Sequence, residues 1–415
     1  MAEWITKTLG KLTSFISKGI PPKYVDEEND DTIRVLNQKC NRNFEISYNE
    51  SRIHNTSAKK VPKNKLLHSG DILINSTGTG TAGRVAQIFN VPVPTTVDGH
   101  MILLRPTKEI ESLYYGYAIK SYQKKIESLA EGSTGQTEIN RQRLQDEIYI
   151  TFPEDKALQK AIGIFLFQID EKIKQNVKIN NNLEQQAQAL FKKWFIDNPE
   201  NIDWSAGTFR ELIQSTLNGD WGKETPTGNN TEKVYCIRGA DIPEVKAGNK
   251  GKMPTRYILP KNLANKKLEA GDIVVEISGG SPTQSTGRCT AITQSLLDRY
   301  DSSMVCTNFC KAIKPKNGYS LFVYYYWQYL YEKGVFFSYE NGTTGIKNLD
   351  FTGFIETESI IVPPFDKVQV FDDYCKSIFS QIFANGKQSE QLVSLRDALL
   401  PKLMSGELDV SDIEL

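Results

Sequence analysis

The chain has 415 residues, and its 50 basic and 50 acidic side chains cancel. At about 100 to 200 residues per domain this length holds two to four domains, and a hydrophobic fraction of 39 % is too high for a disordered chain. A formal net charge of zero argues against a histone-like or tail-driven binder of polyanions. No run approaches the roughly 18 apolar residues of a membrane helix, and Glu3 and Lys7 interrupt any N-terminal signal segment. We therefore expect a globular protein of the cytoplasm.

Metal-ligand spacing is missing from the sequence. The three histidines are not spaced as ligands, and no two cysteines form a C-x-x-C pair. A structural zinc site needs closely paired ligands, so we expect no metal and six reduced thiols. The cysteines are Cys40, Cys236, Cys289, Cys306, Cys310 and Cys375.

The two halves of the chain repeat the same order of motifs. Gly70-Asp71 and Gly271-Asp272 each precede a short apolar strand, which runs into a loop of glycine, serine and threonine. The two loops end in Gly-Arg, at Arg84 and Arg288. Further on, Gly-Ser-Thr-Gly at 132–135 matches Gly-Thr-Thr-Gly at 342–345. An offset match of this kind indicates two copies of one structural unit.

Each unit ends in a short strand, a proline turn and a long helical segment. Apolar residues recur three or four positions apart over 156–195 and 367–404. About forty residues at 1.5 Å each make a rod of about 60 Å, whose narrow apolar stripe needs a partner of similar length. We predict an α+β fold with a pseudo-twofold internal repeat, in which two similar globular α/β domains are separated by two long helices that form an antiparallel coiled coil.

Polar residues interrupt both apolar stripes, at 180–182 (Asn-Asn-Asn) and at 384–386 (Ala-Asn-Gly). We expect a locally polar or bent stretch in each rod. The alternative is that each segment is a pair of unrelated hairpin helices joined by a loop at this place. At the helix ends we expect packing in preference to partner docking for four residues: Leu190, Trp194, Leu399 and Leu403.

Two further features have more than one interpretation. The aromatic clusters at 113–117 and 324–327 are able to stack on bases, but at helical spacing we favour core packing. The glycine-rich loops expose backbone and hydroxyl donors beside an arginine, and such groups fit phosphates and base edges. An ordinary surface turn has the same composition.

Catalytic motifs are absent or incomplete. The G-x-G-x-x-G string at 78–83 runs into Val-Pro-Val-Pro at 91–94 with no helix behind the glycines. The Val-Pro-Pro-Phe string at 362–365 lacks the polar first residue of an amino-methyltransferase motif, and the nuclease-like E-x-K spacing at 244–246 occurs in one half only. We therefore expect no catalytic residue.

The ends of the two long helices carry the most specific strings. Residues 395–408 spell LRDALLPKLMSGEL, and their counterpart at 189–195 spells ALFKKWF. With the Gly-Asp strands and the Gly-Ser/Thr-Thr-Gly segments, these strings give the chain its identity at family level: over essentially its whole length it resembles the DNA-specificity (S) subunits of type I restriction-modification systems.

The resemblance implies two target-recognition domains, each of which reads one half of a bipartite double-stranded DNA sequence. It also implies that the helices set the spacer length and dock two modification (methyltransferase) subunits. Those partners bind S-adenosylmethionine and methylate the exocyclic nitrogen of adenine, and restriction (motor-nuclease) subunits use ATP and magnesium. Because methylation needs a pocket for a flipped base, we expect this chain to be a non-catalytic subunit that binds no cofactor itself.

The repeat and the resemblance together set the expected domain boundaries. They are 1–153 for the first target-recognition domain, 154–200 for the first spacer helix, 201–364 for the second target-recognition domain, 365–408 for the second spacer helix and 409–415 for an acidic tail.

The candidate DNA-binding residues lie in the repeated loops. In the first half they are Thr77, Thr79, Arg84, Ser133, Thr134, Gln136 and Arg141. In the second half they are Ser278, Thr283, Gln284, Arg288, Thr343, Thr344, Lys347 and Asn348.

Two other functions stay open: a coiled-coil scaffold that binds protein, and a self-contained nuclease or methyltransferase with a concealed site. The charge distribution agrees with DNA binding. Residues 1–153 and 201–364 together carry an excess of four basic side chains, and the helical segments and tail carry an excess of four acidic ones. So small an excess predicts that the chain alone binds DNA weakly and that its partners supply much of the phosphate contact.

Overall fold

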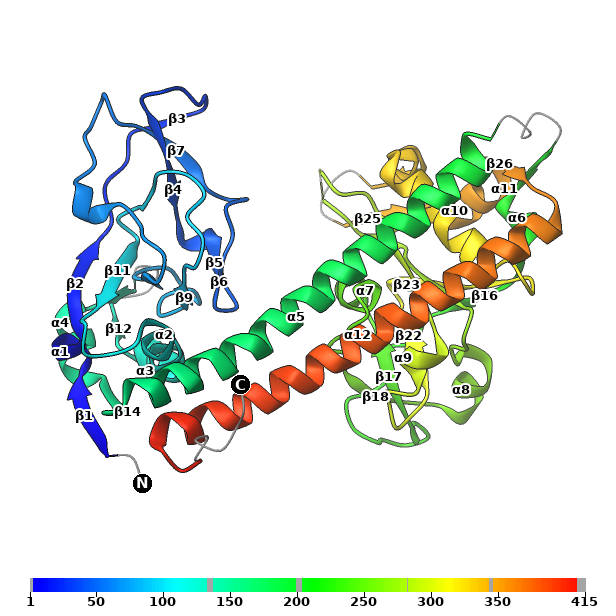
Figure 1. Ribbon diagram of the computed structural model, residues 1–415. Coiled ribbons are helices and arrows are strands. Elements are labelled where there is room, and N and C mark those ends of the chain that lie inside the picture. Colours follow the sequence, from blue (N-terminus) through cyan, green and yellow to red (C-terminus); the bar gives the residue numbers. More distant parts are fainter. Residues whose placement is uncertain (1–2, 133–136, 199–203, 282, 343–345, 409–415) are drawn as a thin grey trace. The chain divides into compact units, whose positions relative to one another are not determined.

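The computed structural model describes residues 3–132, 137–198, 204–281, 283–342 and 346–408. The chain forms two compact units, and Figure 1 labels many of their elements. Unit 1 consists of residues 1–171 and 393–415, and unit 2 consists of residues 172–392. The division runs through both long helices, so each unit contains a part of each helix.

Unit 1 is built on a four-stranded antiparallel sheet in the order β2-β11-β8-β9, with a second four-stranded sheet in the order β10-β4-β7-β3. The strands of the first sheet are β2 (Thr13–Lys18), β8 (Ile72–Asn75), β9 (Val85–Gln87) and β11 (Met101–Pro106). Those of the second are β3 (Tyr24–Val25), β4 (Thr32–Leu36), β7 (Arg52–Asn55) and β10 (Thr95–Val97). Three strand pairs complete the unit: β1 (Trp4–Thr8) with β14 (Tyr149–Pro153), β5 (Asn41–Arg42) with β6 (Glu45–Ile46), and β12 (Ala130–Glu131) with β13 (Glu138–Ile139). The short helices are α1 (Leu9–Leu12), α2 (Ser112–Ser121), α3 (Gln123–Ser128) and α4 (Arg141–Glu147).

Unit 2 has a four-stranded sheet in the order β16-β23-β19-β21 and two three-stranded sheets. The strands of the first sheet are β16 (Ile213–Asn218), β19 (Ile273–Glu276), β21 (Cys289–Ala291) and β23 (Cys310–Pro315). The others are β17 (Glu232–Ile237), β18 (Thr255–Ile258), β22 (Met304–Cys306), β20 (Ser278–Gly279), β24 (Glu340–Asn341), β25 (Lys347–Leu349), β15 (Ser205–Thr208) and β26 (Ser359–Val362). The short helices are α6 (Phe209–Leu212), α7 (Ile242–Lys246), α8 (Pro260–Lys266), α9 (Gln294–Leu297), α10 (Ser320–Glu332) and α11 (Phe351–Thr357).

The central sheets of the two units correspond strand by strand. The order β2-β11-β8-β9 matches β16-β23-β19-β21, and all pairings in both are antiparallel. A helix contacts the equivalent edge strand in each unit, α2 on β9 and α10 on β21. These correspondences confirm the predicted repeat.

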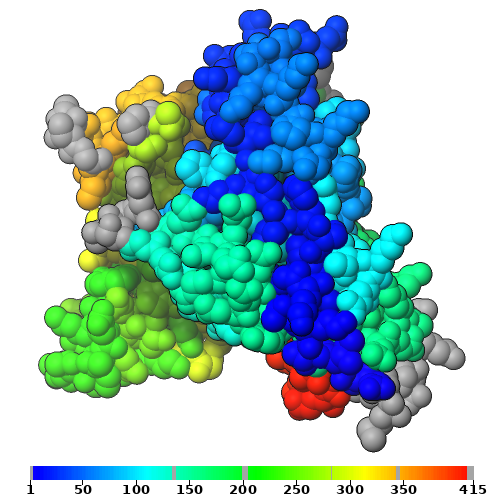
Figure 2. Space-filling model, turned by 90° about the vertical axis from the view of Figure 1, so that its left-hand side faces the viewer, coloured from blue at the N-terminus to red at the C-terminus, as the bar shows by residue number. Residues whose placement is uncertain are grey.

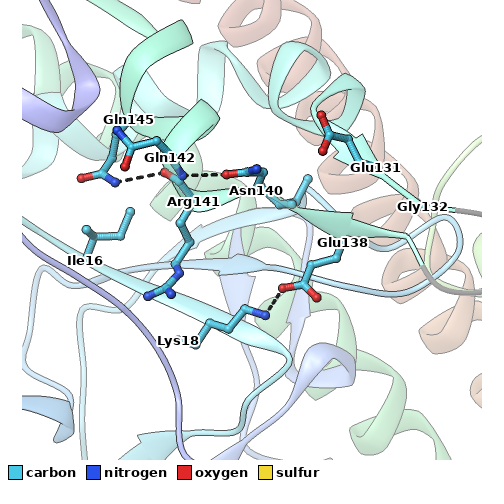
Figure 3. Close-up of a pocket in the computed structure, with 10 residues that line it drawn as sticks. Ile16, Lys18, Glu131, Gly132, Glu138, Asn140, Arg141, Gln142 and Gln145 are labelled. Carbon is cyan, nitrogen blue, oxygen red and sulfur yellow. Dashed lines mark hydrogen bonds and ion pairs between the residues drawn. The ribbon is translucent and has the colours of Figure 1, made fainter.

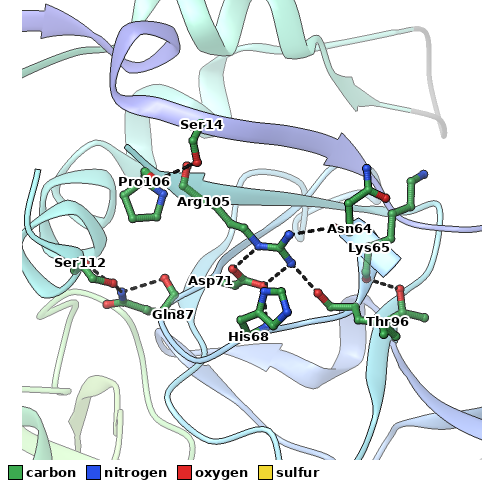
Figure 4. A network of polar contacts seen from close by, with 12 residues as sticks. Ser14, Asn64, Lys65, His68, Asp71, Gln87, Thr96, Arg105, Pro106 and Ser112 are labelled. Carbon is green, nitrogen blue, oxygen red and sulfur yellow. Dashed lines mark hydrogen bonds and ion pairs between the residues drawn. The ribbon is translucent and has the colours of Figure 1, made fainter. Parts of the chain in front are cut away.

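The aspartate of the first Gly-Asp motif holds the central sheet of unit 1 together (Figure 4). Asp71 is buried and accepts a hydrogen bond from the backbone N–H of His68 (2.8 Å). Its carboxylate receives two bonds from Arg105 on the neighbouring strand β11 (2.8 and 3.0 Å). The same guanidinium donates to the backbone carbonyl of Asn64 (2.8 Å). One ion pair thus fixes a turn and two strands.

The second Gly-Asp motif has the same role with a different cation. Asp272 accepts from the backbone N–H of Glu269 (2.9 Å) and pairs with Lys314 on β23 (3.1 Å). The preceding glycines, Gly70 and Gly271, have φ angles of +92° and +97°. A side chain at either position is strained in this backbone conformation, which explains the glycine in both motifs.

The aromatic clusters belong to the hydrophobic cores, as favoured from the sequence. Tyr114, Tyr115 and Tyr117 of α2 are fully buried, and so are Tyr324 and Trp327 of α10. Trp327 also donates its indole N–H to the backbone carbonyl of Gly287 (2.8 Å), at the end of the second glycine-rich loop. The side chains of both clusters are buried and are therefore not free to stack on bases. In unit 2, Trp327 also holds the end of the glycine-rich loop.

The two long helices are α5 (Lys156–Phe191), which continues into a π-helical turn (Lys192–Ile196), and α12 (Phe365–Ser405). In unit 2 their contacts run antiparallel, because Asn176 bonds to Ser389 (3.2 Å) whereas Asn180, one turn later, bonds to Asn385 (2.8 Å). Both helices are continuous where polar residues interrupt their apolar stripes. The polar stretch is confirmed, and the alternative of hairpins joined by a loop is wrong.

The polar stretch anchors a loop of unit 2 to both helices. Asn180 donates its amide N–H to the backbone carbonyls of Ile382 (3.0 Å) and Ala247 (3.1 Å). A Cβ atom at Gly386 would stand 2.0 Å from the carbonyl oxygen of Gly248. Glycine in α12 is therefore required by the close approach of this loop, and not by a bend.

In unit 1 the helices meet around a charged residue. Asp170 of α5 accepts bonds from Arg396 of α12 (2.6 Å), from the Tyr117 hydroxyl (2.7 Å) and from Lys120 (3.2 Å). At the helix ends Leu403 is fully buried, and its three companions pack against the cores of their units, which confirms the expected packing: Leu190, Trp194 and Leu399.

A search of the described helices found none that is both long enough and apolar enough to cross a membrane.

Asn180 and Asn181 offer a matched test of the polar stretch, because they are neighbours of one residue type and only Asn180 is buried. We expect Asn180→Ala to lower the free energy of unfolding by about 1 to 3 kcal/mol, since it removes the side-chain donor to two backbone carbonyls and the acceptor of the buried Asn385 amide. Asn181→Ala should change it by less than about 0.5 kcal/mol. Urea denaturation followed by tryptophan fluorescence measures both, and equal effects would contradict the assignment.

Candidate nucleic-acid interface

Two segments that are far apart in the sequence pair with each other in each unit. In unit 1 Thr77, in the first glycine-rich loop, forms an antiparallel bridge with Glu138. In unit 2 Ser278 occupies the equivalent position of its loop and pairs with Asn348, in β25. Each loop after a Gly-Asp strand therefore lies against the segment that follows the Gly-Ser/Thr-Thr-Gly residues. Among the described candidates, the structure brings Ser278 together with Asn348 in unit 2, whereas the partner of Thr77 in unit 1 is Glu138, which was not a candidate.

In each unit a β-turn lies beside the glycine-rich loop. The turn immediately precedes β11 in unit 1 and β23 in unit 2. The backbone N–H of Ser76 donates to the carbonyl of His100 (2.8 Å), and that of Ile277 donates to the carbonyl of Phe309 (2.9 Å). His100 and Phe309 are both exposed beside the loops. The sequence analysis missed them, although the offset that aligns strand 101–106 with strand 310–315 also aligns these two residues.

Arg84 and Arg288 end the two loops in the same backbone geometry. The N–H of Asn75 donates to the carbonyl of Arg84 (3.0 Å), and the N–H of Glu276 donates to that of Arg288 (2.8 Å). The side chains differ. Arg84 is partly exposed and donates to the carbonyl of Gly80 (3.0 Å), and among the described residues no carboxylate pairs with it.

Arg288 is held by a carboxylate. Its guanidinium donates two parallel bonds to Glu276 (both 2.8 Å), a residue whose side chain is 8 % exposed, and this hydrogen bonding raises the pKa of Arg288. In the amide orientation that satisfies both groups, Gln284 also accepts bonds from Arg288 (2.8 and 3.1 Å). Because unit 1 has neutral Asn75 where unit 2 has Glu276, Arg84 keeps an uncompensated charge and Arg288 does not.

Two further candidates of unit 2 make contacts within the unit. Lys347 pairs with Glu340 (2.7 Å), and its amine lies 5.0 Å from the centre of the Phe337 ring. Asn348 accepts a hydrogen bond from the Ser278 hydroxyl (2.7 Å). The ion pair joins β25 to β24, and the hydrogen bond joins β25 to β20.

Unit 1 has a hollow next to its loop, whose lining includes two basic residues, Lys18 and Arg141, and two acidic ones, Glu131 and Glu138. A cavity of about 700 Å³ is lined by Lys18, Glu138 and Arg141 among other residues, and Figure 3 shows the Arg141 side chain extending toward the Lys18 and Glu138 ion pair. No carboxylate of the described residues pairs with Arg141. Burial and then the nearby Arg141 lower the pKa of Lys18 and of Lys65, which indicates that positive charges crowd together here.

The hollow lies where the N-terminal strands meet the segment that leads into β14. In Figure 2 the first residues (dark blue) lie at the surface of unit 1 beside residues coloured teal. The pairing of β1 with β14 and the contact of α1 with α4 produce this neighbourhood. Arg141 is the first residue of α4, and Asn140 caps that helix by accepting from the N–H of Gln142 (2.9 Å).

The other candidates are less informative. Thr79 and Thr283 are exposed in their loops. Five candidates lie outside the described residues: Ser133, Thr134, Gln136, Thr343 and Thr344.

The glycine-rich string at 78–83 lacks the structural context of a dinucleotide-binding motif. The glycine-rich loop at 78–83 is followed by β9 and not by a helix. All six cysteines are buried and unpaired with one another, and burial raises the pKa of Cys236 and Cys289 to about 12. Among the described residues no three histidine, cysteine, aspartate or glutamate side chains form a metal-binding cluster.

The chain is similar to known proteins in both sequence and fold. The family model for the type I restriction modification DNA specificity domain matches residues 1–185. The MjaIX specificity subunit of Methanocaldococcus jannaschii is 25 % identical over 99 % of this chain and 95 % of its own length. The HindI specificity subunit of Haemophilus influenzae is 22 % identical over 98 % of this chain and all of its own.

Residues 1–185 thus match the type I restriction modification DNA specificity domain, and over nearly its whole length the chain is similar to type I specificity subunits. The solved S subunit from M. genitalium has the same fold, with a TM-score of 0.59, 18 % identity and coverage of 99 % of this chain and 97 % of the other. The predicted fold class is confirmed. The predicted family and the predicted assignment to a non-catalytic component agree with the names of the relatives, which are specificity subunits.

Substitution of Arg84 and of Arg288 should have different effects on stability. Arg288→Ala leaves the carboxylate of Glu276 largely buried without its partner, so we expect the free energy of unfolding of unit 2 to fall by about 2 to 4 kcal/mol. Arg84→Ala should change stability by less than about 0.5 kcal/mol.

Thermal and urea unfolding measure both effects. The double change Glu276→Gln with Arg288→Ala should recover part of the loss, because no buried charge is then unpaired. A double variant as unstable as Arg288→Ala alone would show that packing, and not charge, is responsible.

Proposed function

We propose that each unit of this specificity subunit reads one half of a bipartite double-stranded DNA target. The proposal rests on one observation: the same arrangement of loop, turn and paired segment is built twice, at Thr77 and Glu138 and again at Ser278 and Asn348. Hydroxyl, amide and guanidinium groups are the ones that read base edges and phosphates. A repeated chain with different side chains in the repeated place suits a target with two different halves.

The long helices are proposed to set the number of unread base pairs between the half-sites. Buried polar contacts support a fixed register, since Asn176 and Asn180 each have defined partners on α12. A polar residue in a helical interface specifies register at some cost in stability. The helices would then act as a ruler of constant length.

The partners and cofactors of the complex are also part of the proposal. We propose that two modification subunits dock on the helices, that they bind S-adenosylmethionine, and that restriction subunits use ATP and magnesium. Apolar side chains stay exposed along the helices and support docking there: Val177, Ile179, Val370, Tyr374 and Leu395. Because methylation requires a flipped base to enter a catalytic pocket, the chemistry is assigned to the partners and this chain holds no cofactor. The DNA target places the complex in the cytoplasm.

Mapping of methylated adenines in cells that express the chain with its modification subunits tests the core of this proposal. We expect one word made of two constant parts and an unread spacer of fixed length. Methylation by the purified chain alone would favour a self-contained methyltransferase. Indifference to DNA in the presence of its partners would favour a protein scaffold.

The ruler is tested by lengthening both helices at a place that leaves their polar contacts intact. Four residues are inserted in α5 between Glu171 and Asn176, and four in α12 between Ser389 and Val393. Each insertion adds about 6 Å, so the spacer should grow by one or two base pairs at about 3.4 Å each. Methylation mapping reads the result. An unchanged spacer would refute the proposal that the helices act as a ruler. The control is a variant in which the residues beside each insertion point are changed to alanine and nothing is inserted.

Arg84 and Arg141 are expected to contact DNA in their own half. Alanine at either position should weaken DNA binding by the assembled complex and reduce the slope of log affinity against log salt concentration by about one. Arg143→Ala is the matched control, because Arg143 lies on the same helix as Arg141 and is already paired with Glu131 and Glu147. If Arg84→Ala left affinity and half-site choice unchanged, its assignment would fail.

A further inference from the structure

The two units differ most clearly in the side chain at one equivalent position. His100 in unit 1 and Phe309 in unit 2 are the third residue of the same β-turn, which a hydrogen bond from the first residue of the next strand closes (3.2 Å in unit 1, 2.9 Å in unit 2). In both units the carbonyl of this residue accepts a bond from the start of the glycine-rich loop (2.8 and 2.9 Å). The two side chains therefore leave the backbone at the same place in each unit.

The chemistry at that place is polar in unit 1. The imidazole Nδ1 of His100 lies 2.9 Å from the hydroxyl of Thr77, which also receives a hydrogen bond from the amide of Gln38. These groups offer a hydrogen-bonding surface of the kind that reads base edges.

In unit 2 the same place is apolar. The Phe309 side chain is 57 % exposed, and two more exposed apolar residues lie on the paired segment and beside it: Phe337 at 45 % and Ile346 at 61 %. Ile346 precedes Lys347 in the chain, and the amine of Lys347 lies over the Phe337 ring. Leaving these side chains in water forfeits the free energy of burying them. Their position beside the loop favours a ligand that has an apolar feature of its own.

The charges around Phe309 agree with a nucleic-acid ligand that is read without many ionic contacts. Arg288 and Lys347 are neutralised by Glu276 and Glu340. Lys311, two residues after Phe309, lies 5.0 Å over the Phe351 ring, and no carboxylate of the described residues pairs with it. One open cation beside an apolar cluster matches a phosphate beside an apolar group of a base.

We propose that unit 2 identifies a thymine of its half-site through Phe309, whose ring contacts the C5-methyl group in the major groove. The methyl of thymine is the apolar group that base pairs present in that groove. Unit 1 has His100 at the same place and recognises its base by hydrogen bonding. This inference rests on the proposed function, in which each unit reads one half-site.

The test uses the full chain assembled with its modification subunits. The DNA duplexes carry the target sequence that methylation mapping identifies. Each thymine in turn is replaced by deoxyuridine, which removes only the methyl group. The half-site of each unit is assigned first, by photo-crosslinking from an exposed loop position, Thr79 in unit 1 and Thr283 in unit 2. We expect the wild-type complex to bind about fivefold more weakly at one substituted position of the unit 2 half-site.

Variants at Phe309 then decide whether its ring is responsible. Phe309→Ala should bind the thymine duplex about as weakly as wild type binds the deoxyuridine duplex, and should no longer distinguish the two. Phe309→Leu keeps an apolar contact and should keep the preference, whereas Phe309→His should lose it. His100→Ala is the matched control: it should weaken binding through unit 1 and leave the deoxyuridine effect in unit 2 unchanged. Because Phe309 is exposed, these variants are expected to fold, which circular dichroism checks.

Three results would overturn the inference while leaving the proposed function intact. They are a unit 2 half-site in which no thymine is sensitive to loss of its methyl group, a Phe309→Ala complex that is as sensitive as wild type, and a Phe309→Ala chain that fails to assemble with its modification subunits. The last would make the ring a protein contact. Failure to find any two-part methylated word would instead refute the proposed function.

Discussion

The ion pair between the Gly-Asp motif and the neighbouring strand is the interaction on which the rest of each unit depends. Asp71 ties the turn before β8 to Arg105 of β11, and Asp272 does the same for β19 through Lys314. Both aspartates are almost fully buried, so loss of either partner would leave a costly unpaired charge. The pair fixes which strands are neighbours. Antiparallel register then places the start of the second strand opposite the end of the first, Met101 opposite Asn75 in unit 1.

That register explains why the candidate interface lies where it does. A turn that precedes the second strand must lie beside the loop that follows the first, which brings His100 to Thr77. Cys310 pairs with Glu276 in the same way, so Phe309 lies beside Ser278. The framework of buried aspartate, strands and turn is common to both units, and the side chains it displays are free to differ. The two units share one backbone geometry and display different side chains on it. This is what is expected when a common scaffold carries sites that bind different targets.

The repeated framework could be predicted from the sequence because its signals are local. A glycine at positive φ before a buried aspartate, a 3.6-residue apolar period and an aromatic segment at helical spacing each have one dominant physical cause. The role of Gly386 could not be predicted, because the close approach of residues 247–249 to α12 joins segments far apart in the chain. The interface was predicted in part. The two loops and the segments that pair with them were found, but His100 and Phe309 were missed because neither residue type nor local pattern marks a turn as exposed.

Arg84 and Arg288 show why the charge count of a sequence differs from the charge that a ligand meets. The two residues end equivalent loops, and their sequence context does not distinguish them. Glu276 neutralises the charge of Arg288, whereas the neutral Asn75 leaves the charge of Arg84 uncompensated. Lys347 and Glu340 repeat this cancellation on the same side of unit 2. A carboxylate at about 3 Å turns a cation into one end of a dipole of zero net charge, whose field falls off faster with distance than the field of the lone cation. The near-neutral total therefore conceals a local difference: unit 1 offers open cations at Arg84 and Arg141, and unit 2 offers the exposed Phe309 ring, with Arg288 and Lys347 compensated and Lys311 open. The charge that a ligand meets therefore depends on where individual acidic residues lie, and Glu276 in the place of Asn75 is enough to neutralise the arginine that ends the loop.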